Sequence, residues 1–271
     1  GGDGPDELFA GYEYFVGFNL AERYLRLPKL LRKGLIEPLA RVLPQSSGYV
    51  NPRAVARTFL AGAAAPRNLR VQTWLSAFSP EAQMSLWNHP DRDFLSPARL
   101  FAPTTALYDA FPADRPLAKV FYAFARQYML DYILVKVDRC SMMHSLEVRA
   151  PFLDRDVAEF ACRLPINMKI RGDKRKYLLK KAVADILPRE IYSRPKRGFL
   201  IPSAMWLRDS LAPQMDELLG EAHLRRQGLF DPQAVRTLVN VHAQGRADRR
   251  KELWTLLVLQ LWLEHNKPRI E

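Results

Sequence analysis

The stretch LAKVFYAFARQYMLDYILV, residues 117–135, decides the fold of this chain. Its apolar side chains fall on nearly every side of a helix, which is typical of a helix buried in the middle of a protein. Apolar residues also recur at helical spacing over residues 8–43, where Pro28 and Pro38 divide them into short helices. Strand patterns are almost absent, so we predict a mainly α fold.

Further helices are predicted on both sides of this stretch. Residues 88–115 are rich in proline and polar turns, and we expect an irregular connection there. The longest apolar stretch, residues 253–263, is shorter than the roughly 20 residues that a bilayer span needs, so no membrane partner is expected. The other predicted helices cover residues 154–163, 177–186, 204–219, 232–244 and 251–265.

The chain is strongly basic, with 41 Lys and Arg against 29 Asp and Glu and a formal net charge of +12. These cations are scattered through the predicted helices, and no stacking aromatic residues alternate with them. We therefore expect a solvated surface or a phosphate-bearing small substrate rather than a nucleic acid partner. A non-catalytic basic helical module that binds polyanions is kept as an alternative. Two cysteines, Cys140 and Cys162, are too few for a disulfide framework, which favours a cytoplasmic protein.

The first candidate for a site is the loop GGDGPDELFAGY, residues 1–12. Glycine backbone can approach a ligand closely, and Pro5 suits the first turn of a helix. A carboxylate beside a phosphate repels it unless a divalent cation lies between them, so Asp6 is a candidate Mg²⁺ ligand. The structural alternative is an ordinary capped helix start. The glycines in question are Gly1, Gly2 and Gly4.

The second candidate is LVKVDRCSMMHSLEVRAPFLD, residues 134–154, in which five ionisable residues lie among apolar ones. Buried charges are costly unless they are paired or bound to a ligand. Pro151 favours extended backbone before it, so we expect Glu147 and Arg149 to project into a cleft. A set of structural ion pairs is the alternative. The five residues are Lys136, Asp138, Arg139, Glu147 and Arg149.

The third candidate is SRPKRGFLIPSAMWL, residues 193–207. Its proline and glycine predict a shaped loop. The ammonium of Lys196 is a compact charge that suits a departing phosphate. A solvated basic loop is the alternative. The cations of this region are Arg189, Arg194, Lys196 and Arg197.

Together, in this order, the three stretches resemble the C-terminal synthetase domain of glutamine-hydrolysing asparagine synthetase. The first resembles the family loop Gly-Asp-Gly-x-Asp-Glu-Leu-Phe-x-Gly-Tyr, and the second its segment ending in Pro-Phe-Leu-Asp. The similarity continues through KYLLKKAVADILPREIYSRPKRGFLIP to LWTLLVLQLWL near the end. It implies that residues 1–271 are the helical C-terminal part of an α/β adenine nucleotide α-hydrolase-like (ATP pyrophosphatase) domain whose N-terminal part is missing.

The resemblance implies an ATP-dependent carbon–nitrogen ligase. In the family, ATP and aspartate give a β-aspartyl-adenylate and pyrophosphate, and ammonia from glutamine then attacks the activated carbonyl. Preorganised cations stabilise charge at the phosphates, and a carboxylate can take a proton from the amine. The positions carried over are Gly1, Gly2, Gly4 and Arg149 for the nucleotide, Asp3 facing the reaction centre, Asp6 for Mg²⁺, Glu147 for amide formation and Lys196 for pyrophosphate.

Two family features have no counterpart in the sequence: an initial cysteine nucleophile and a Ser-Gly-Gly-x-Asp-Ser pyrophosphate loop. We therefore expect a fragment that lacks the glutaminase domain and is inactive alone, and a homodimer is a candidate assembly. A related amidotransferase or cyclase that acts on another carboxylate is the second enzymatic alternative. Asp3 favours the asparagine type, because β-lactam synthetase has a tyrosine near that position.

Overall fold

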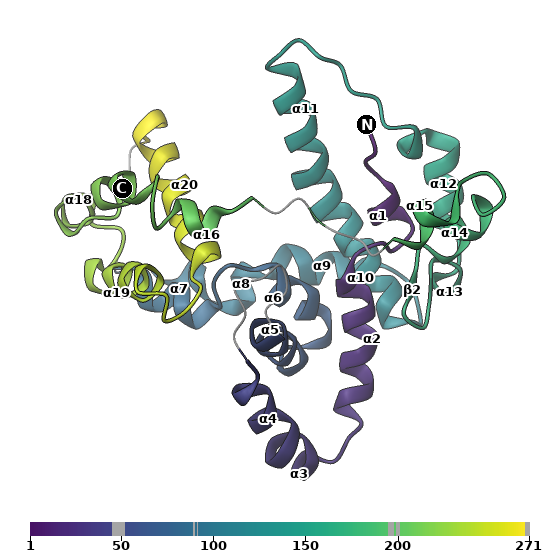
Figure 1. Cartoon of the computed structure of the whole chain (residues 1–271), viewed down its shortest axis with the longest axis horizontal. Coiled ribbons are helices and arrows are strands. Elements are labelled where there is room, and N and C mark those ends of the chain that lie inside the picture. Colours follow the sequence, from purple (N-terminus) through teal and green to yellow (C-terminus); the bar gives the residue numbers. More distant parts are fainter. Residues whose placement is uncertain (45–51, 89, 91, 195–197, 199–200, 269–271) are drawn as a thin grey trace. The chain divides into compact units, whose positions relative to one another are not determined.

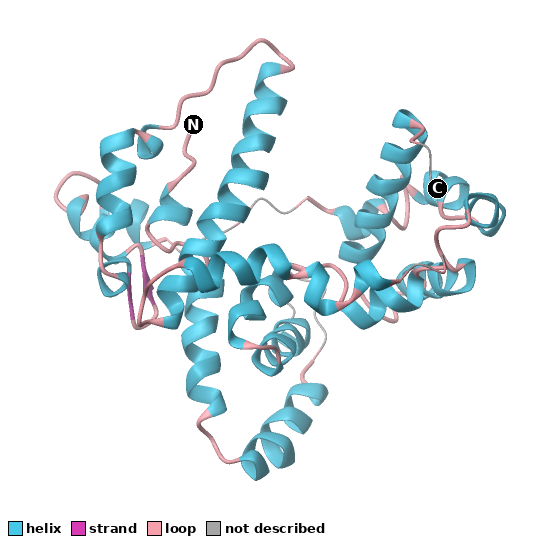
Figure 2. Cartoon of the chain, turned by 180° about the vertical axis from the view of Figure 1, so that it is seen from behind, coloured by secondary structure: helices cyan, strands magenta, loops and turns pink. Residues whose placement is uncertain are grey.

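A computed structural model describes residues 1–44, 52–88, 90, 92–194, 198 and 201–268 of the chain (Figure 1). It confirms the mainly α prediction, since helices make up most of the described chain and the strands form one short hairpin (Figure 2). The chain divides into two compact units. Unit 1 comprises residues 1–75 and 101–196, and unit 2 comprises residues 76–100 and 197–271. No helix among the described residues is both long and apolar enough to cross a membrane.

Unit 1 holds the first two candidate stretches. Its α-helices are α1 (Pro5–Leu8), α2 (Glu13–Leu25), α3 (Lys29–Leu31), α4 (Glu37–Val42), α5 (Pro52–Ala64), α6 (Arg70–Leu75), α9 (Ala102–Ala110), α10 (Pro116–Phe124), α11 (Val135–Met142), α12 (Arg155–Arg163), α13 (Ile166–Lys169), α14 (Tyr177–Ala182) and α15 (Arg189–Ser193). Its short or irregular helices are η1 (Arg32–Ile36), η2 (Arg67–Leu69), η4 (Ala125–Leu134) and η5 (Pro151–Leu153). Strands β1 (Ile170–Arg171) and β2 (Lys174–Arg175) pair antiparallel around a turn that contains Gly172 at φ 66°.

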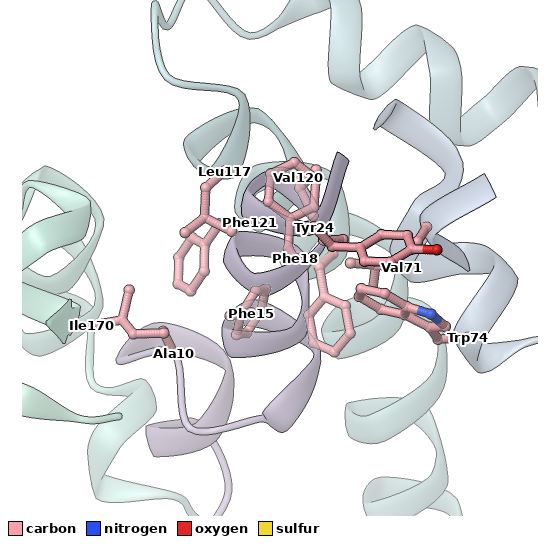
Figure 3. Close-up of a cluster of buried hydrophobic side chains, with 13 residues drawn as sticks. Ala10, Phe15, Phe18, Tyr24, Val71, Trp74, Leu117, Val120, Phe121 and Ile170 are labelled. Atoms are coloured by element: carbon pink, nitrogen blue, oxygen red, sulfur yellow. The ribbon is translucent and has the colours of Figure 1, made fainter. Parts of the chain in front are cut away.

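Aromatic side chains form the main core of unit 1 (Figure 3). Helix α2 buries a face made by Phe15, Phe18, Ala21 and Tyr24, whose spacing of three residues keeps them on one side. Phe15 contacts the rings of Phe121 and Phe124 on α10, with ring centroids 5.3 Å apart in both pairs. The packing of α2 on α10 therefore fixes the direction in which the chain leaves the opening loop.

The long central helix differs from its prediction. Segments α10, η4 and α11 run on without a break from Pro116 to Met142, and η4 is wound as a π-helix. In α10 the residues Leu117, Val120 and Phe124 are buried, but Tyr132 is 54% exposed and α11 has no buried residue. Burial on every side thus holds only for the first half, because the second half extends past the elements that cover α10.

Unit 2 has a core of leucine and other aliphatic side chains around α20, with Phe230. Asp231 caps α19 by accepting a hydrogen bond from the backbone N–H of Ala234 at 2.9 Å. Gly228, at φ 77°, ends α18. The elements of unit 2 are α7 (Pro80–Leu86), η3 (Asp93–Leu95), α8 (Pro97–Leu100), α16 (Ser203–Trp206), α17 (Ala212–Leu218), α18 (Glu221–Gln227), α19 (Pro232–Ala243) and α20 (Arg250–Asn266).

Three secondary-structure predictions need correction. Residues 97–110, expected to be irregular, form α8 and α9, and each begins with a proline in its first turn. The helix predicted over residues 204–219 is divided into α16 and α17 by a turn at residues 207–211. The predicted helix over 177–186 ends at Ala182. The helices predicted at 154–163, 232–244 and 251–265 agree with α12, α19 and α20 to within a residue.

Candidate functional site

The opening loop turns into α1 at Gly4, which has φ 104°. A Cβ at this position would lie 2.8 Å from Leu153 Cδ2 in η5. Both the positive φ and this contact require glycine. The first candidate stretch is therefore packed against the Pro-Phe-Leu end of the second.

A buried glutamate that was not among the predicted site residues closes the loop. Glu7 is only 3% exposed, and its Oε2 accepts a hydrogen bond from the Gly4 N–H at 3.1 Å. The Tyr12 hydroxyl donates to Glu7 Oε1 at 2.5 Å. Burial, and then this hydrogen bond, raise the pKa of Tyr12 well above its usual value. The spacing from Gly4 to Glu7 is that of a capping box, a sequence signal that could have identified this role.

The start of the loop lies beside the extended backbone that follows α11. The Gly1 nitrogen donates to the Arg149 carbonyl oxygen at 2.6 Å. A Cβ on Gly1 would lie 2.9 Å from Asp3 Oδ2 and also 2.9 Å from Val148 Cγ1. The structure therefore brings Gly1 and the half-buried Asp3 to the segment that carries Glu147 and Arg149.

Glu147 and Arg149 form an ion pair with each other. Their side chains are 65% and 88% exposed, so the charges face solvent. Because neighbouring side chains alternate along extended backbone, residues two apart lie on the same side. This pair was one of the alternatives for the second stretch, and in the described part of the chain it is the arrangement that these two residues adopt.

The sequence led us to expect buried charges in the second stretch, and this expectation is wrong. All five are exposed, because α11 has left the core before the first of them and the extended segment follows it. Met143, at 82%, and Leu146, at 60%, are exposed as well. The five are Lys136, Asp138, Arg139, Glu147 and Arg149.

Asp6 is paired with Lys176, the residue that follows the β-hairpin and precedes α14. Its Oδ1 lies 2.8 Å from Lys176 Nζ, and the Lys176 N–H donates to the Phe9 carbonyl oxygen at 3.2 Å. A Cβ on Gly11 would lie 2.0 Å from Asp6 Oδ1 and 2.3 Å from Lys176 Cε. The ion pair therefore occupies the space above Gly11. Lys176 stands 170 positions from Asp6 in the sequence, and no local pattern pointed to the contact.

Lys196 lies outside the described residues, together with Pro195 and Arg197. The flanking cations Arg189 and Arg194 are exposed. The role of Lys196 toward pyrophosphate, which the family resemblance implies, therefore stays a prediction.

The opening loop leaves its backbone open at Gly2, while the carboxylate of Asp6 is already paired with a cation. A Cβ on Gly2 would meet no described atom within 4 Å, so the backbone is open to a ligand there, and the Arg149 guanidinium is suited to phosphate. Among the described residues, no group of three or more His, Cys, Asp and Glu could hold a metal. A magnesium ion at Asp6 would compete with the Lys176 ammonium and would need phosphate oxygens as further ligands.

The comparisons with known proteins place the chain in a family of ligase enzymes. A family model described as asparagine synthase matches residues 1–264. The chain therefore belongs to the asparagine synthase family.

Curated relatives agree with this assignment. The glutamine-hydrolyzing asparagine synthetase 1 of Bacillus subtilis is 26% identical over 263 residues, covering 96% of this chain and 39% of the relative. A putative glutamine-hydrolyzing asparagine synthetase of Mycobacterium tuberculosis is 30% identical over 271 residues, covering 96% of this chain and 38% of the relative. Amidase chyE of Penicillium rubens is 24% identical over 272 residues, covering 88% of this chain and 37% of the relative. The chain thus spans about two fifths of the length of these relatives. No solved structure gives a significant match.

Proposed function

We propose that this chain is the helical part of a synthetase domain that makes asparagine from aspartate and ATP through a β-aspartyl-adenylate. Ammonia would come from glutamine hydrolysis in an N-terminal domain outside the given sequence. The family match over residues 1–264 carries the proposal. The docking of the opening loop on the Arg149 segment supports it, because two family motifs meet there.

The proposed chemistry divides between acids and cations. Asp3 faces the reaction centre, and Glu147 takes a proton from the attacking ammonia. Gly1, Gly2 and Gly4 let the backbone approach the nucleotide, whose phosphates are suited to the Arg149 guanidinium. Lys196 neutralises the departing pyrophosphate. Bound ATP supplies the adenylyl group that activates the carboxylate of aspartate.

Asp6 is the proposed magnesium ligand, in competition with Lys176 for the same carboxylate. We also propose that both units belong to one partial synthetase domain within an α/β nucleotide-binding fold. The location would be cytoplasmic and a homodimer is a candidate assembly. On this proposal the given chain, which covers a minor part of its relatives, is inactive by itself.

The test uses a longer protein that contains this chain, assayed for pyrophosphate release with ATP and aspartate. Lys196→Ala should remove about 3 kcal/mol of transition-state stabilisation, a loss of more than about 100-fold in rate. Glu147→Gln should leave ATP binding intact and slow amide formation. Unchanged pyrophosphate release in Lys196→Ala would reject its role, and asparagine or AMP formation by the given chain alone would reject its inactivity.

A related amidotransferase that acts on another carboxylate is the second candidate. The relatives named as amidases from Gibberella zeae and Penicillium rubens, 23% and 24% identical, favour it. Pyrophosphate release measured across a panel of amino-acid and peptide carboxylates separates the two. A marked preference for aspartate supports asparagine synthesis, and release with another carboxylate alone supports this second candidate.

A further inference from the structure

Strained backbone gathers at the candidate site of unit 1. A positive φ is unfavourable for residues that have a Cβ, and such residues are concentrated where a protein positions a ligand or a catalytic group. Ser145 has φ 56° and lies two positions before Glu147. Ala10, at φ 56°, belongs to the opening loop, and Lys176, at φ 52°, forms an ion pair with that loop. The fourth such residue in the described part of the chain, Lys267, ends α20 of unit 2.

The turn at Ser145 ends α11. The Leu146 N–H donates to the Ser141 carbonyl oxygen at 3.1 Å, and the Ser145 N–H donates to the Met142 carbonyl oxygen at 2.9 Å. These two hydrogen bonds form a Schellman motif, in which the residue with positive φ is usually glycine. The apolar contact that often accompanies the motif does not bury Leu146, which is 60% exposed. The backbone of Ser145 therefore carries the change of direction at the end of the helix.

The segment behind this turn is held at its other end by the opening loop. In Figure 1 the chain turns at the end of α11 and runs back past the N-terminus toward α12. There the Arg149 carbonyl oxygen accepts a hydrogen bond from the Gly1 nitrogen at 2.6 Å. Glu147, between the two ends, is 65% exposed and its ion pair is with Arg149 of the same segment. The pair does not tie Glu147 to the core, so its position depends on the backbone at the two ends.

We propose that Ser145 is a positioning residue for Glu147, through the left-handed turn that directs the segment. The inference rests on the function proposed above, in which Glu147 takes a proton from the attacking ammonia. Such a carboxylate must stay within hydrogen-bond reach of the amine, and a misplacement of about 1 Å can lower the rate by about 100-fold. Packing fixes a buried acid such as Glu7, whereas backbone geometry at Ser145 fixes the exposed Glu147.

The backbone conformation of Ser145, rather than its hydroxyl, carries this role. The hydrogen bonds of the turn are made by backbone groups, so residues that accept a positive φ should replace serine. Glycine and asparagine adopt this conformation readily, whereas valine, which is branched at Cβ, does not. Function should therefore be kept with Gly or Asn at this position and lost with Val. A role for the hydroxyl would make all three substitutions equally harmful.

The test uses the longer protein that contains this chain, with ATP, aspartate and ammonia. Ser145→Val should slow amide formation by about 10-fold or more, while single-turnover pyrophosphate release without ammonia stays within about twofold of the parent rate. Ser145→Gly and Ser145→Asn should form amide within about threefold of the parent rate. In the Glu147→Gln background the same valine should cause no further loss, because the turn acts through this carboxylate.

Hydrogen exchange of the Ser145 and Leu146 amides, measured in the same proteins, reports the turn without any assay of activity. We expect exchange about tenfold faster in Ser145→Val and parent-like exchange in Ser145→Asn, because local opening follows the strain at this residue. The matched control is Lys267→Val, which places the same side chain at another exposed residue with positive φ. It should leave amide formation and the exchange of these two amides unchanged.

Four results overturn the proposal. Parent-like exchange or parent-like amide formation in Ser145→Val means that other contacts hold Glu147. Loss of pyrophosphate release together with amide formation, or an equal loss in Lys267→Val, assigns the effect to the stability of the whole protein. Equal losses in the three Ser145 variants assign it to the hydroxyl. A further loss from valine in the Glu147→Gln background shows that Ser145 does not act through this carboxylate. A parent protein that forms no amide with aspartate or another carboxylate rejects the proposed function instead, and hydrogen exchange then decides by itself whether Ser145 fixes the segment.

Discussion

The opening loop and the segment around Glu147 both carry family motifs, yet they hold their charges in opposite ways. Glu7 in the loop is buried and committed to Gly4 and Tyr12, whereas Glu147 is exposed and paired with Arg149. The loop is held in place by its own side chains. The segment places its charges where a ligand can reach them. A buried motif residue such as Glu7 thus serves the fold, whereas an exposed one such as Glu147 stays accessible to a ligand.

The largest expected effect comes from Glu7→Ala. It would leave the Gly4 N–H and the Tyr12 hydroxyl without their acceptor, and a buried polar group without a partner costs about 1–3 kcal/mol. We expect the free energy of unfolding to fall by about 3–4 kcal/mol in urea titrations followed by circular dichroism.

The matched control for this change is Glu147→Ala, the same substitution at an exposed acid. We expect it to change the free energy of unfolding by less than about 0.5 kcal/mol. Equal losses of unfolding free energy in the two variants would contradict the view that the loop buries its acid for stability and the segment does not.

The next effect comes from Gly11→Ala, which tests how tightly the loop is packed against the β-hairpin. The new methyl group would lie 2.0 Å from Asp6 Oδ1 and 2.9 Å from the Asp6 Cα, so side chain and backbone must both move. Overpacking of this kind costs about 1–3 kcal/mol, and we expect the upper end. Gly2→Ala, whose methyl group meets no described atom within 4 Å, is the control in the same urea titration.

Lys169 offers a test on a buried cation. It is 2% exposed, and its Nζ lies 4.1 Å from the centre of the Phe121 ring. Burial lowers the pKa of Lys169 from 10.5 to about 8. Between these two pH values the unfolded chain holds a proton that the folded chain has released. The free energy of unfolding should therefore fall as the pH falls from 10.5 to about 8, and stay level below that.

Lys169→Met should remove this pH dependence and raise the free energy of unfolding at pH 7 by about 2 kcal/mol. The pKa shift sets a limit of roughly 3 kcal/mol, and the cation–π interaction with Phe121 offsets part of it. The difference between the two proteins, measured in urea at several pH values, cancels the titration of all other groups. A difference that does not vary between pH 8 and 10.5 would contradict the buried-cation account.

Much of the fold followed from periodicity, and its errors have physical causes. Helices α12, α19 and α20 were predicted from the helical spacing of their apolar residues, and α12 and α19 also begin at a capping aspartate. The pattern of residues 117–135 could not reveal that burial stops midway, because apolar side chains there are covered only where other elements happen to pack. Prolines at residues 97–103 suggested irregular structure, although proline in the first turn favours a helix.

The candidate site was predicted in its composition rather than its contacts. The loop and the segment of Glu147 meet, and Gly4 has a positive φ, a conformation that glycine adopts readily. The partner of Asp6 could not be foreseen, because Lys176 lies far along the chain, between the hairpin and α14. The exposure of Glu147 was also missed, since apolar neighbours in sequence were taken as neighbours in space. The role of Lys196 stays a prediction.

The smallest expected effect is the coupling energy between Glu147 and Arg149. It tests most directly whether the charges of this segment, unlike those of the opening loop, are unimportant for stability. Exposed ion pairs contribute about 0.2–1 kcal/mol, because water and salt screen the charges. A double-mutant cycle with Glu147→Gln and Arg149→Gln should therefore give a coupling below about 1 kcal/mol in urea titrations, decreasing with added salt. A coupling above about 2 kcal/mol would mean that the pair holds the segment in place. A small coupling, together with slowed amide formation by Glu147→Gln in the longer protein, would assign this carboxylate to the chemistry.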